Sequence, residues 1–289
     1  MAFRRSALSN FLQITRAFRY STIPLSSNSP SLIHGIHVFH CPDEVGIVAK
    51  LSECIAQHGA NIHYVDVFVP EKKQVFYSRS EFVFDPVRWP HDVMLNDFMN
   101  IGKLFNAKRS VVRVPDLDPK YKIALLASNQ DHCLVDVLHD WQDGRLPVDI
   151  SCVISNHDRA PNTHVINFLK RHGIPYYYLP ADEGNKRERE ILDLVKGTDF
   201  LVLARYMQVL SAGFLESYGK DIINIHHGLL PSFKGSNPAK QVERVSHKDS
   251  LQSFVQKSQS LEKQCLRRAI QSYCELRVLP YEGKKTVVF

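Results

Sequence analysis

The chain has 289 residues, 44% of them hydrophobic, which is enough to form the cores of two ordinary domains. Its formal charge of +6 arises mainly in the first 42 residues, which contain four arginines and no acidic residue. The rest of the chain has nearly balanced charges and no stripe of basic residues interleaved with aromatic ones, which argues against a nucleic-acid partner. No apolar run approaches the ~20 residues of a membrane-spanning helix, so we expect no membrane partner.

Residues 1–30 have the composition of an organellar transit peptide and linker, because they are rich in Arg and Ser, lack acidic residues and contain scattered apolar residues. We predict that this leader directs the chain to the mitochondrion. A chloroplast address is the nearest alternative, and a tail without a targeting role is the other.

The cysteines and histidines form no recognisable ligand pattern. The six cysteines include no Cys-x-x-Cys pair, which fits a reducing compartment and ordinary buried thiols. His34, His37 and His40 have mixed spacing along one strand, and no His-Glu-x-x-His pattern is present. We therefore predict satisfied core or surface histidines and no metal site.

Residues 31–115 predict a first domain with the element order βαββαβ, which is typical of a ferredoxin-like α+β fold. We expect helices at 45–58 and 92–105 and strands at 33–39, 62–69, 75–84 and 110–114. The first helix is predicted to bury Val48, Leu51 and Ile55 and to end at Gly59, a residue suited to the left-handed conformation.

The turn before this helix, residues 43–46, offers Asp43 as an N-cap and Gly46 at the helix start, where backbone N–H groups can meet the carboxylate of a small ligand. Capping alone is the alternative role of Asp43. The domain resembles the ACT domain, a small-molecule-sensing module that usually works in pairs. The resemblance implies a small amino-acid effector near Asp43 and Gly46 and a homo-oligomeric protein.

After a proline-bounded linker at 114–119, residues 120–289 alternate strands with helices. We predict strands at 122–127, 149–154, 175–179, 199–204 and 221–226, helices at 132–141, 163–172 and 186–196, and finally a helix at 261–276 and a strand at 286–289. Such alternation indicates a mostly parallel α/β sheet that binds its ligands at the carboxyl ends of the strands. The charged run at 185–190 is expected to be a solvated helix face.

The most informative segment is Asn-Ile-His-His-Gly-Leu-Leu-Pro-Ser-Phe-Lys-Gly at residues 224–235. Because side chains alternate along a strand, Asn224 and His226 point the same way and His227 points the opposite way. An amide that donates a hydrogen bond and an imidazole that moves a proton suit chemistry on a carbonyl group. A strand end with satisfied polar residues is the alternative.

The whole of this segment, with Asn237-Pro238 after it, resembles the signature of the folate-dependent formyltransferase superfamily, in the form of its hydrolytic branch, the formyltetrahydrofolate deformylases. The resemblance implies a Rossmann-like domain, a folate substrate, no cofactor, and hydrolysis of 10-formyltetrahydrofolate to tetrahydrofolate and formate. It implies that Asn224 polarises the formyl oxygen and that His226 stabilises the tetrahedral intermediate or protonates the leaving nitrogen. Gly235 would contact the substrate.

Two further loops are expected at the site. The loop around residues 203–210 resembles the one that holds the pterin in this superfamily, and its expected substrate-binding residues are Arg205, Tyr206, Met207, Gln208, Val209 and Leu210. Plain core is the alternative role of Met207, Val209 and Leu210.

The second loop, residues 128–133, has no glycine, whereas a phosphate cradle needs the close backbone approach that glycine permits. This argues against a phosphorylated amine as formyl acceptor and for water. Asp131 and His132 are candidates for the acceptor pocket, with capping of the following helix as the alternative for Asp131.

The chain departs from its family after Gln241, where it passes directly to Val-Glu-Arg-Val-Ser-His. Relatives have a helix, further strands and a loop with a catalytic aspartate at this point, so we predict an incomplete domain that lacks the residue positioning water. Two functions follow as alternatives to an active deformylase. One is an impaired or inactive isoform that binds folate or regulates a full-length relative, and the other is a formyltransferase that uses another amine.

Overall fold

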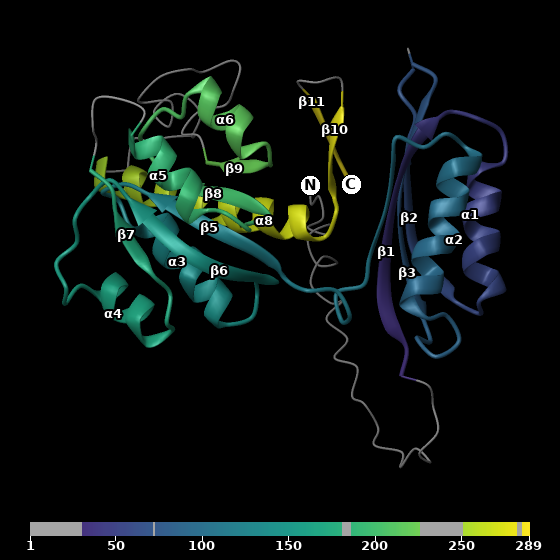
Figure 1. Cartoon of the computed structure of the whole chain (residues 1–289), viewed down its shortest axis with the longest axis horizontal. Coiled ribbons are helices and arrows are strands. Elements are labelled where there is room, and N and C mark those ends of the chain that lie inside the picture. The colour runs from purple at the N-terminus through teal and green to yellow at the C-terminus, as the bar shows by residue number, and fades with distance from the viewer. Residues whose placement is uncertain (1–30, 72, 181–185, 226–250, 282–284) are drawn as a thin grey trace, which may run out of the picture.

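The computed structural model describes residues 31–71, 73–180, 186–225, 251–281 and 285–289. These residues form two domains that lie side by side, with a C-terminal β-hairpin between them (Figure 1). The predicted leader at residues 1–30 and the site residues His226 and Gly235 lie outside the described residues, as does the departure after Gln241.

The N-terminal domain contains one four-stranded antiparallel sheet in the order β2-β3-β1-β4, with α1 and α2 on one of its faces (Figure 1). The bounds of its elements are β1 Ile33–Pro42, α1 Ile47–Gln57, β2 Asn61–Phe68, β3 Val75–Phe84, α2 His91–Leu104 and β4 Arg109–Arg113. The predicted βαββαβ order is confirmed.

The start of α1 differs from the prediction in two ways. The helix buries Ile47, Leu51 and Ile55 at intervals of one turn, whereas Val48 is exposed, because a helix that begins at Ile47 turns Val48 away from the sheet. Gly46, with φ of 95°, occupies the N-cap position, so Asp43 is not the cap; Asp43 and Gly46 both lie exposed in the preceding turn.

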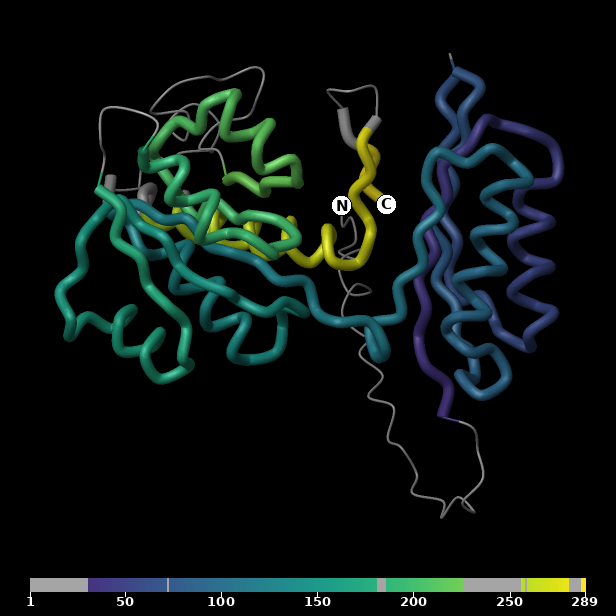
Figure 2. The backbone as a smooth tube through the Cα atoms, in the orientation of Figure 1, coloured from purple at the N-terminus to yellow at the C-terminus, as the bar shows by residue number. Residues whose placement is uncertain are grey.

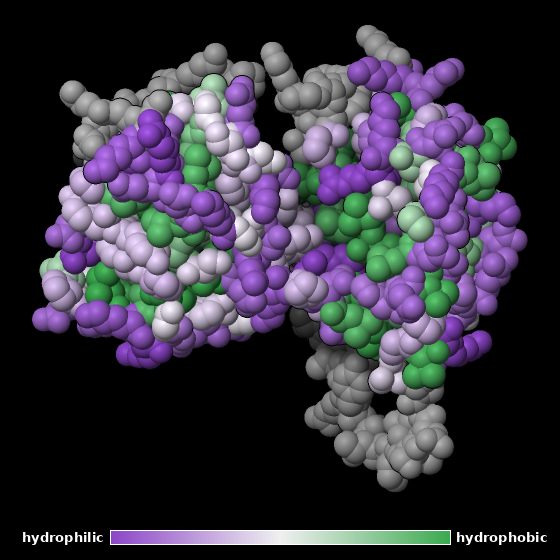
Figure 3. Space-filling model, viewed as in Figure 1, coloured by the Kyte–Doolittle hydropathy of each residue, from purple (hydrophilic) through white to green (hydrophobic). Residues whose placement is uncertain are grey.

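A groove of about 430 Å³ lies between α2 and β4. Its lining combines apolar and polar side chains: Leu95, Phe98, Met99, Gly102, Lys103, Asn106, Ala107, Ser110 and Val112. Apolar side chains gather on the N-terminal domain in the space-filling view, whereas the α/β domain is more polar on that face (Figure 3). The groove belongs to the N-terminal domain, so it is separate from the carboxyl ends of the parallel strands.

The second domain contains a five-stranded parallel sheet in the order β7-β6-β5-β8-β9. The bounds are β5 Tyr121–Ala127, α3 His132–Gln142, β6 Val148–Ser155, α4 His164–Arg171, β7 Tyr176–Tyr178, α5 Lys186–Leu194, β8 Phe200–Ala204, α6 Ala212–Tyr218 and β9 Ile222–Asn224. Helices α3, α4 and the C-terminal α8 pack on one face of the sheet, and α5 and α6 pack on the other. The predicted parallel α/β sheet is confirmed.

Helix α8 (Leu251–Cys274) runs along the parallel sheet and leads into the hairpin β10 (Val278–Tyr281) and β11 (Lys285–Val288), which lies between the domains (Figure 2). Sequence patterns missed α6 and β10 and placed the start of α8 at residue 261. Short elements of four to seven residues show too little periodicity to be recognised. None of the helices in the described part of the chain is long and apolar enough to cross a membrane.

The C-terminal hairpin covers the face of the N-terminal sheet that the helices leave free. Leu276 and Leu279 pack against Ile36, Val38 and Tyr77 in one buried cluster. Two arginines add polar contacts across the same junction. The fully buried Arg79 on β3 donates a hydrogen bond of 3.0 Å from Nε to the carbonyl oxygen of Glu275, just after α8, and also pairs with Glu81. Arg277 Nη2 lies 2.9 Å from the same Glu81 carboxylate, so the two domains are joined by apolar packing and by charge.

We expect Arg79→Ala to lower the free energy of unfolding by about 3 kcal/mol, because removing one member of a buried ion pair leaves its partners unsatisfied. Urea denaturation measures this loss. Lys50→Ala serves as the control, since it removes an exposed 2.7 Å ion pair with Glu53 and should cost below about 1 kcal/mol. Equal losses for the two variants would show that the Arg79 junction does not stabilise the fold.

His37 on β1 is buried, and its Nε2 lies 3.0 Å from Ser110 Oγ while its ring stacks on Phe98 with centroids 3.9 Å apart. Burial lowers the pKa of His37 from 6.5 to about 3. The unfolded chain therefore binds a proton that the folded chain does not bind between those two values, so the free energy of unfolding falls as the pH falls through this window.

We expect His37→Phe to flatten the fall in unfolding free energy between about pH 6 and about pH 4.5, because one such proton contributes about 1.4 kcal/mol per pH unit. Urea denaturation at a series of pH values gives the slope for each variant. His63→Phe, at an exposed position on β2, is the control and should leave the slope unchanged. A wild-type slope in His37→Phe would mean that this ring is protonated in the folded chain.

Candidate functional site

The site forms where three neighbouring parallel strands end. Ala127 at the end of β5 pairs with Ala204 at the end of β8, and Leu203 of β8 pairs with Asn224 at the end of β9. Because parallel strands end at one edge of the sheet, the loops after β5 and β8 begin at the same edge as Asn224. Asn224 is exposed, so its amide is available to a ligand at this edge.

The loop after β8 presents apolar side chains to solvent instead of burying them. Met207 is 59% exposed and Val209 is 88% exposed, so the core alternative is wrong for both residues, whereas Tyr206 is buried and Leu210 packs against the core. The loop leaves the sheet edge at Arg205, which has a φ of 60°. Exposed apolar residues at the carboxyl ends of parallel strands suit contact with a flat, partly apolar ligand.

Neighbouring elements hold this loop in place. The backbone N–H of Met207 donates to Ser128 Oγ at 2.8 Å, and Gln208 Oε1 accepts from Arg187 Nη1 at 3.2 Å. Glu188 of α5 accepts hydrogen bonds from the backbone N–H and the hydroxyl of Ser211 at 2.7 and 2.5 Å. The prediction of a solvated face at 185–190 is therefore wrong at Glu188, which is buried because it holds the start of α6.

The loop after β5 is filled by a guanidinium that the sequence did not indicate. Arg159 lies in the loop after β6, and its side chain is 6% exposed. It donates to Ser155 Oγ at 2.7 Å, to Tyr176 Oη at 2.6 Å and to the carbonyl oxygen of Ser128 at 2.7 Å. It also forms an ion pair with Asp131. The sequence offered one signal for a role of Arg159 at the site, namely its position four residues after the end of β6, at the carboxyl edge of the sheet.

Both candidates for the acceptor pocket therefore have partners within the chain. Asp131 holds the N-cap position of α3 without a side-chain capping hydrogen bond, because its carboxylate faces Arg159. The capping alternative for Asp131 is thus wrong. His132 Nε2 lies 2.8 Å from Glu262 Oε2.

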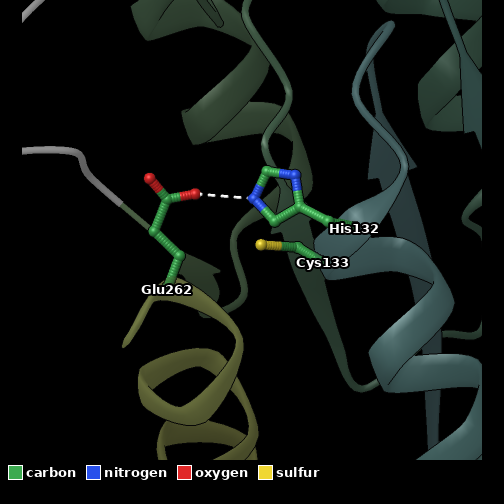
Figure 4. Close-up of side chains that lie close together, drawn as sticks. All are labelled: His132, Cys133 and Glu262. Atoms are coloured by element: carbon green, nitrogen blue, oxygen red, sulfur yellow. Dashed lines mark hydrogen bonds and ion pairs between the residues drawn. The ribbon is translucent and has the colours of Figure 1, made fainter. Parts of the chain in front are cut away.

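Glu262 projects from α8 toward His132, with Cys133 beside them (Figure 4). The same carboxylate oxygen accepts from Arg205 Nη1 at 2.6 Å, so one oxygen joins the loop after β5 to the loop after β8. The side chains of His132, Arg205 and Glu262 are only 11 to 13% exposed. Sequence patterns gave no sign of this role for Glu262, since its position is an ordinary one in a long helix.

His132, Cys133 and Glu262 bring ligand atoms within 4.8 Å of one another, and these are residue types that bind zinc. Two features oppose a divalent cation here. Burial, with the nearby charge of Glu262, raises the pKa of the Cys133 thiol to about 12, so the thiolate form that binds metal is disfavoured. The guanidinium of Arg205 already neutralises the carboxylate. The cluster is therefore best described as a buried ion pair with an imidazole.

Comparison with known proteins agrees with this architecture. Residues 121–250 match the model of the formyl transferase family. Formyltetrahydrofolate deformylase 2, mitochondrial, from Arabidopsis thaliana is 66% identical, over 91% of this chain and 89% of that protein. Its formyltetrahydrofolate deformylase 1, mitochondrial, is 60% identical, over 99% and 98%. The latter alignment extends over 316 positions, more than the length of this chain, so part of that relative has no counterpart here.

A solved structure gives the same result for the fold. The crystal structure of a formyltetrahydrofolate deformylase from Pseudomonas syringae pv. tomato has a TM-score of 0.77 and 32% sequence identity, and the match covers 89% of this chain and 94% of that chain. Both domains are thus included in the likeness. With this parallel sheet and relatives of this similarity, the chain belongs to the formyltetrahydrofolate deformylase family.

Proposed function

We propose that this chain hydrolyses 10-formyltetrahydrofolate to tetrahydrofolate and formate. The observation that carries the proposal is the exposed amide of Asn224 at the end of β9, beside the exposed apolar loop after β8. The loop would hold the pterin, with Arg205 to Leu210 lining the substrate site. Asn224 would donate a hydrogen bond to the formyl oxygen as negative charge develops on it. His226 and Gly235 keep the roles that the resemblance assigned to them.

Water as the acceptor is supported by the loop after β5. The carboxylate of Asp131 faces this loop, and the Ser128 carbonyl oxygen is bound to Arg159. The lack of glycine and the pairing of Arg159 with Asp131 both disfavour the phosphate of an amine acceptor, because a phosphate needs converging backbone N–H groups and available positive charge. A small neutral acceptor such as water needs neither a glycine-rich backbone cradle nor a free positive charge.

The location, partners and cofactor of the chain are proposals of the same kind. The acid-free leader and the mitochondrial names of the two plant relatives support a mitochondrial location. We propose that no cofactor takes part, that a small amino acid binds near Asp43 and Gly46, and that the protein is a homo-oligomer. Among the described residues β4 is an edge strand of its sheet, next to the groove of mixed apolar and polar lining, and this supports the last point.

The departure predicted after Gln241 leads us to propose a second candidate, a folate-binding or regulatory protein that pairs with a full-length relative. Its support is the excess of aligned positions over the length of this chain, which shows that a relative carries residues that this chain lacks. The two candidates differ in a measurable way, since only the first releases formate.

The purified full chain should release formate from 10-formyltetrahydrofolate, and Asn224→Ala should lower kcat by about 10²- to 10³-fold, because an oxyanion donor acts mainly in the transition state. A coupled formate assay beside circular dichroism measures both activity and folding. Asn96→Ala, at an exposed position on α2, is the matched control and should keep full activity.

Folded wild-type chain that binds folate but releases no formate would disprove the hydrolase proposal. Co-purification with a full-length relative would then favour the regulatory candidate. Equal turnover in wild type and Asn224→Ala would show that formate is released at another site.

A further inference from the structure

The carboxylate of Glu262 is placed to act on the candidate site, although it comes from a helix that follows the segment with Asn224 by many residues. Glu262 contacts His132 at 2.8 Å and Arg205 at 2.6 Å, and both residues follow strands that end at this edge. Arg205 comes two residues after Leu203, which pairs with Asn224. The imidazole and the carboxylate therefore lie at the same edge of the sheet as the candidate oxyanion donor, where β5, β8 and β9 end.

The contact with Glu262 also determines the chemistry of the His132 ring. A carboxylate that already accepts from a guanidinium can only accept from the imidazole, so Nε2 of His132 carries the hydrogen. In a neutral imidazole the other nitrogen, Nδ1, then holds the lone pair and is the proton acceptor. A carboxylate that fixes the tautomer and orientation of an imidazole is the arrangement that makes histidine an efficient general base.

We infer that Glu262 and His132 form a carboxylate–imidazole pair that prepares the hydrolytic water, an inference that rests on the proposed function. His132 Nδ1 takes one proton from water as the water oxygen bonds to the formyl carbon. The carbon–nitrogen bond then breaks, and the leaving nitrogen receives that proton from His132. The remaining product is formic acid, which ionises to formate. His132 is the catalytic residue of the pair, and Glu262 is a positioning residue.

The fold gives this pair a firm support. Helix α8 buries Leu266 and Ile270 against the parallel sheet, and Tyr273 Oη donates to Asp221 Oδ2 at 2.7 Å just before β9. The chain just beyond the helix is held by Arg79 through the Glu275 carbonyl. Glu262 therefore has a defined position relative to the sheet, as a residue that orients a base requires.

If the predicted segment with the catalytic aspartate is missing, His132 and Glu262 would supply the group that prepares water. The side chain of His132 is buried enough to be held in one orientation, and the residue begins α3 directly after the loop where the acceptor is expected. A metal ion would compete with Arg205 for the same oxygen, so the imidazole is the better candidate to lower the barrier to water attack.

The test is a double-mutant cycle on the full chain with His132→Asn, Glu262→Gln and the two combined. We expect kcat to fall by about 10²-fold or more in His132→Asn and by about tenfold in Glu262→Gln, with KM changed by less than about threefold. In the double variant the second change should add little, because Glu262 acts through His132. Nitrogen NMR of labelled histidine should show hydrogen on Nε2 of His132 in wild type.

Asp136→Asn is the matched control. Asp136 lies one turn along α3 from His132, and its Oδ1 is 3.9 Å from Lys263 Nζ on α8. The substitution therefore removes a contact between the same two helices without touching the pair. It should retain wild-type kcat and circular dichroism, which separates loss of the pair from loss of helix packing.

The outcomes separate the inference from the proposed function. A wild-type chain without formate release disproves the function itself. Formate release with unchanged kcat in Glu262→Gln and His132→Asn overturns the inference alone. Additive losses of kcat in the double variant would show that Glu262 does not act through His132. A rise in KM with unchanged kcat in Glu262→Gln would show that Glu262 instead acts through Arg205 on substrate binding. Either outcome overturns the inference. Hydrogen on Nδ1 of His132 in wild type would contradict the pair regardless of turnover.

Discussion

The packing of α8 against the parallel sheet is the contact on which the rest of this structure depends. Leu266, Ile270 and Cys274 are buried on the sheet, so the helix closes the core of the second domain. Near its middle it supplies Glu262 to the edge of the strands, and just past its end the chain passes to the N-terminal sheet. One amphipathic helix thus serves the core, the candidate site and the domain junction.

Three buried guanidinium groups mark the places where segments distant in sequence meet. Arg79 joins the N-terminal sheet to the residue after α8, Arg159 fills the loop after β5, and Arg205 joins the loop after β8 to α8. A planar group with five donors can satisfy several carbonyl and carboxylate oxygens at once, which a lysine cannot do. The side chains of Arg159 and Arg205 are 6% and 13% exposed, and their contacts keep the loops of the candidate site in defined positions.

The same charges make the acceptor side of the site selective. Asp131 forms an ion pair with Arg159, and the exposed apolar residues Met207 and Val209 lie on the loop after β8. A flat apolar ligand with a small neutral acceptor fits this division, because the apolar loop can bind the ligand while the guanidinium of Arg159 is already occupied by Asp131 and the Ser128 carbonyl oxygen. The local chemistry is therefore compatible with the reaction proposed from membership in the deformylase family.

Periodicity and motifs determined much of this protein without coordinates. The alternation of strands and helices was sufficient for both sheets, and the segment at 224–235 was sufficient for the family, because local pattern controls element type and a long motif is rarely formed by chance. The face of α1 was predicted with one error, Val48 in place of Ile47, since a shift of one residue at a helix start rotates the buried stripe.

Tertiary structure alone decided which charges meet. Glu262 lies 130 residues from His132, and Arg79 lies 196 residues from Glu275, so no local pattern in the sequence relates them. The burial of Glu188 and the exposure of Met207 likewise depend on which element covers a loop. Sequence by itself determined the family, the layered fold and the position of Asn224, because these follow from local periodicity and from a contiguous motif. The partners of the site residues were decided by three-dimensional packing, since contact between distant segments depends on where whole helices lie.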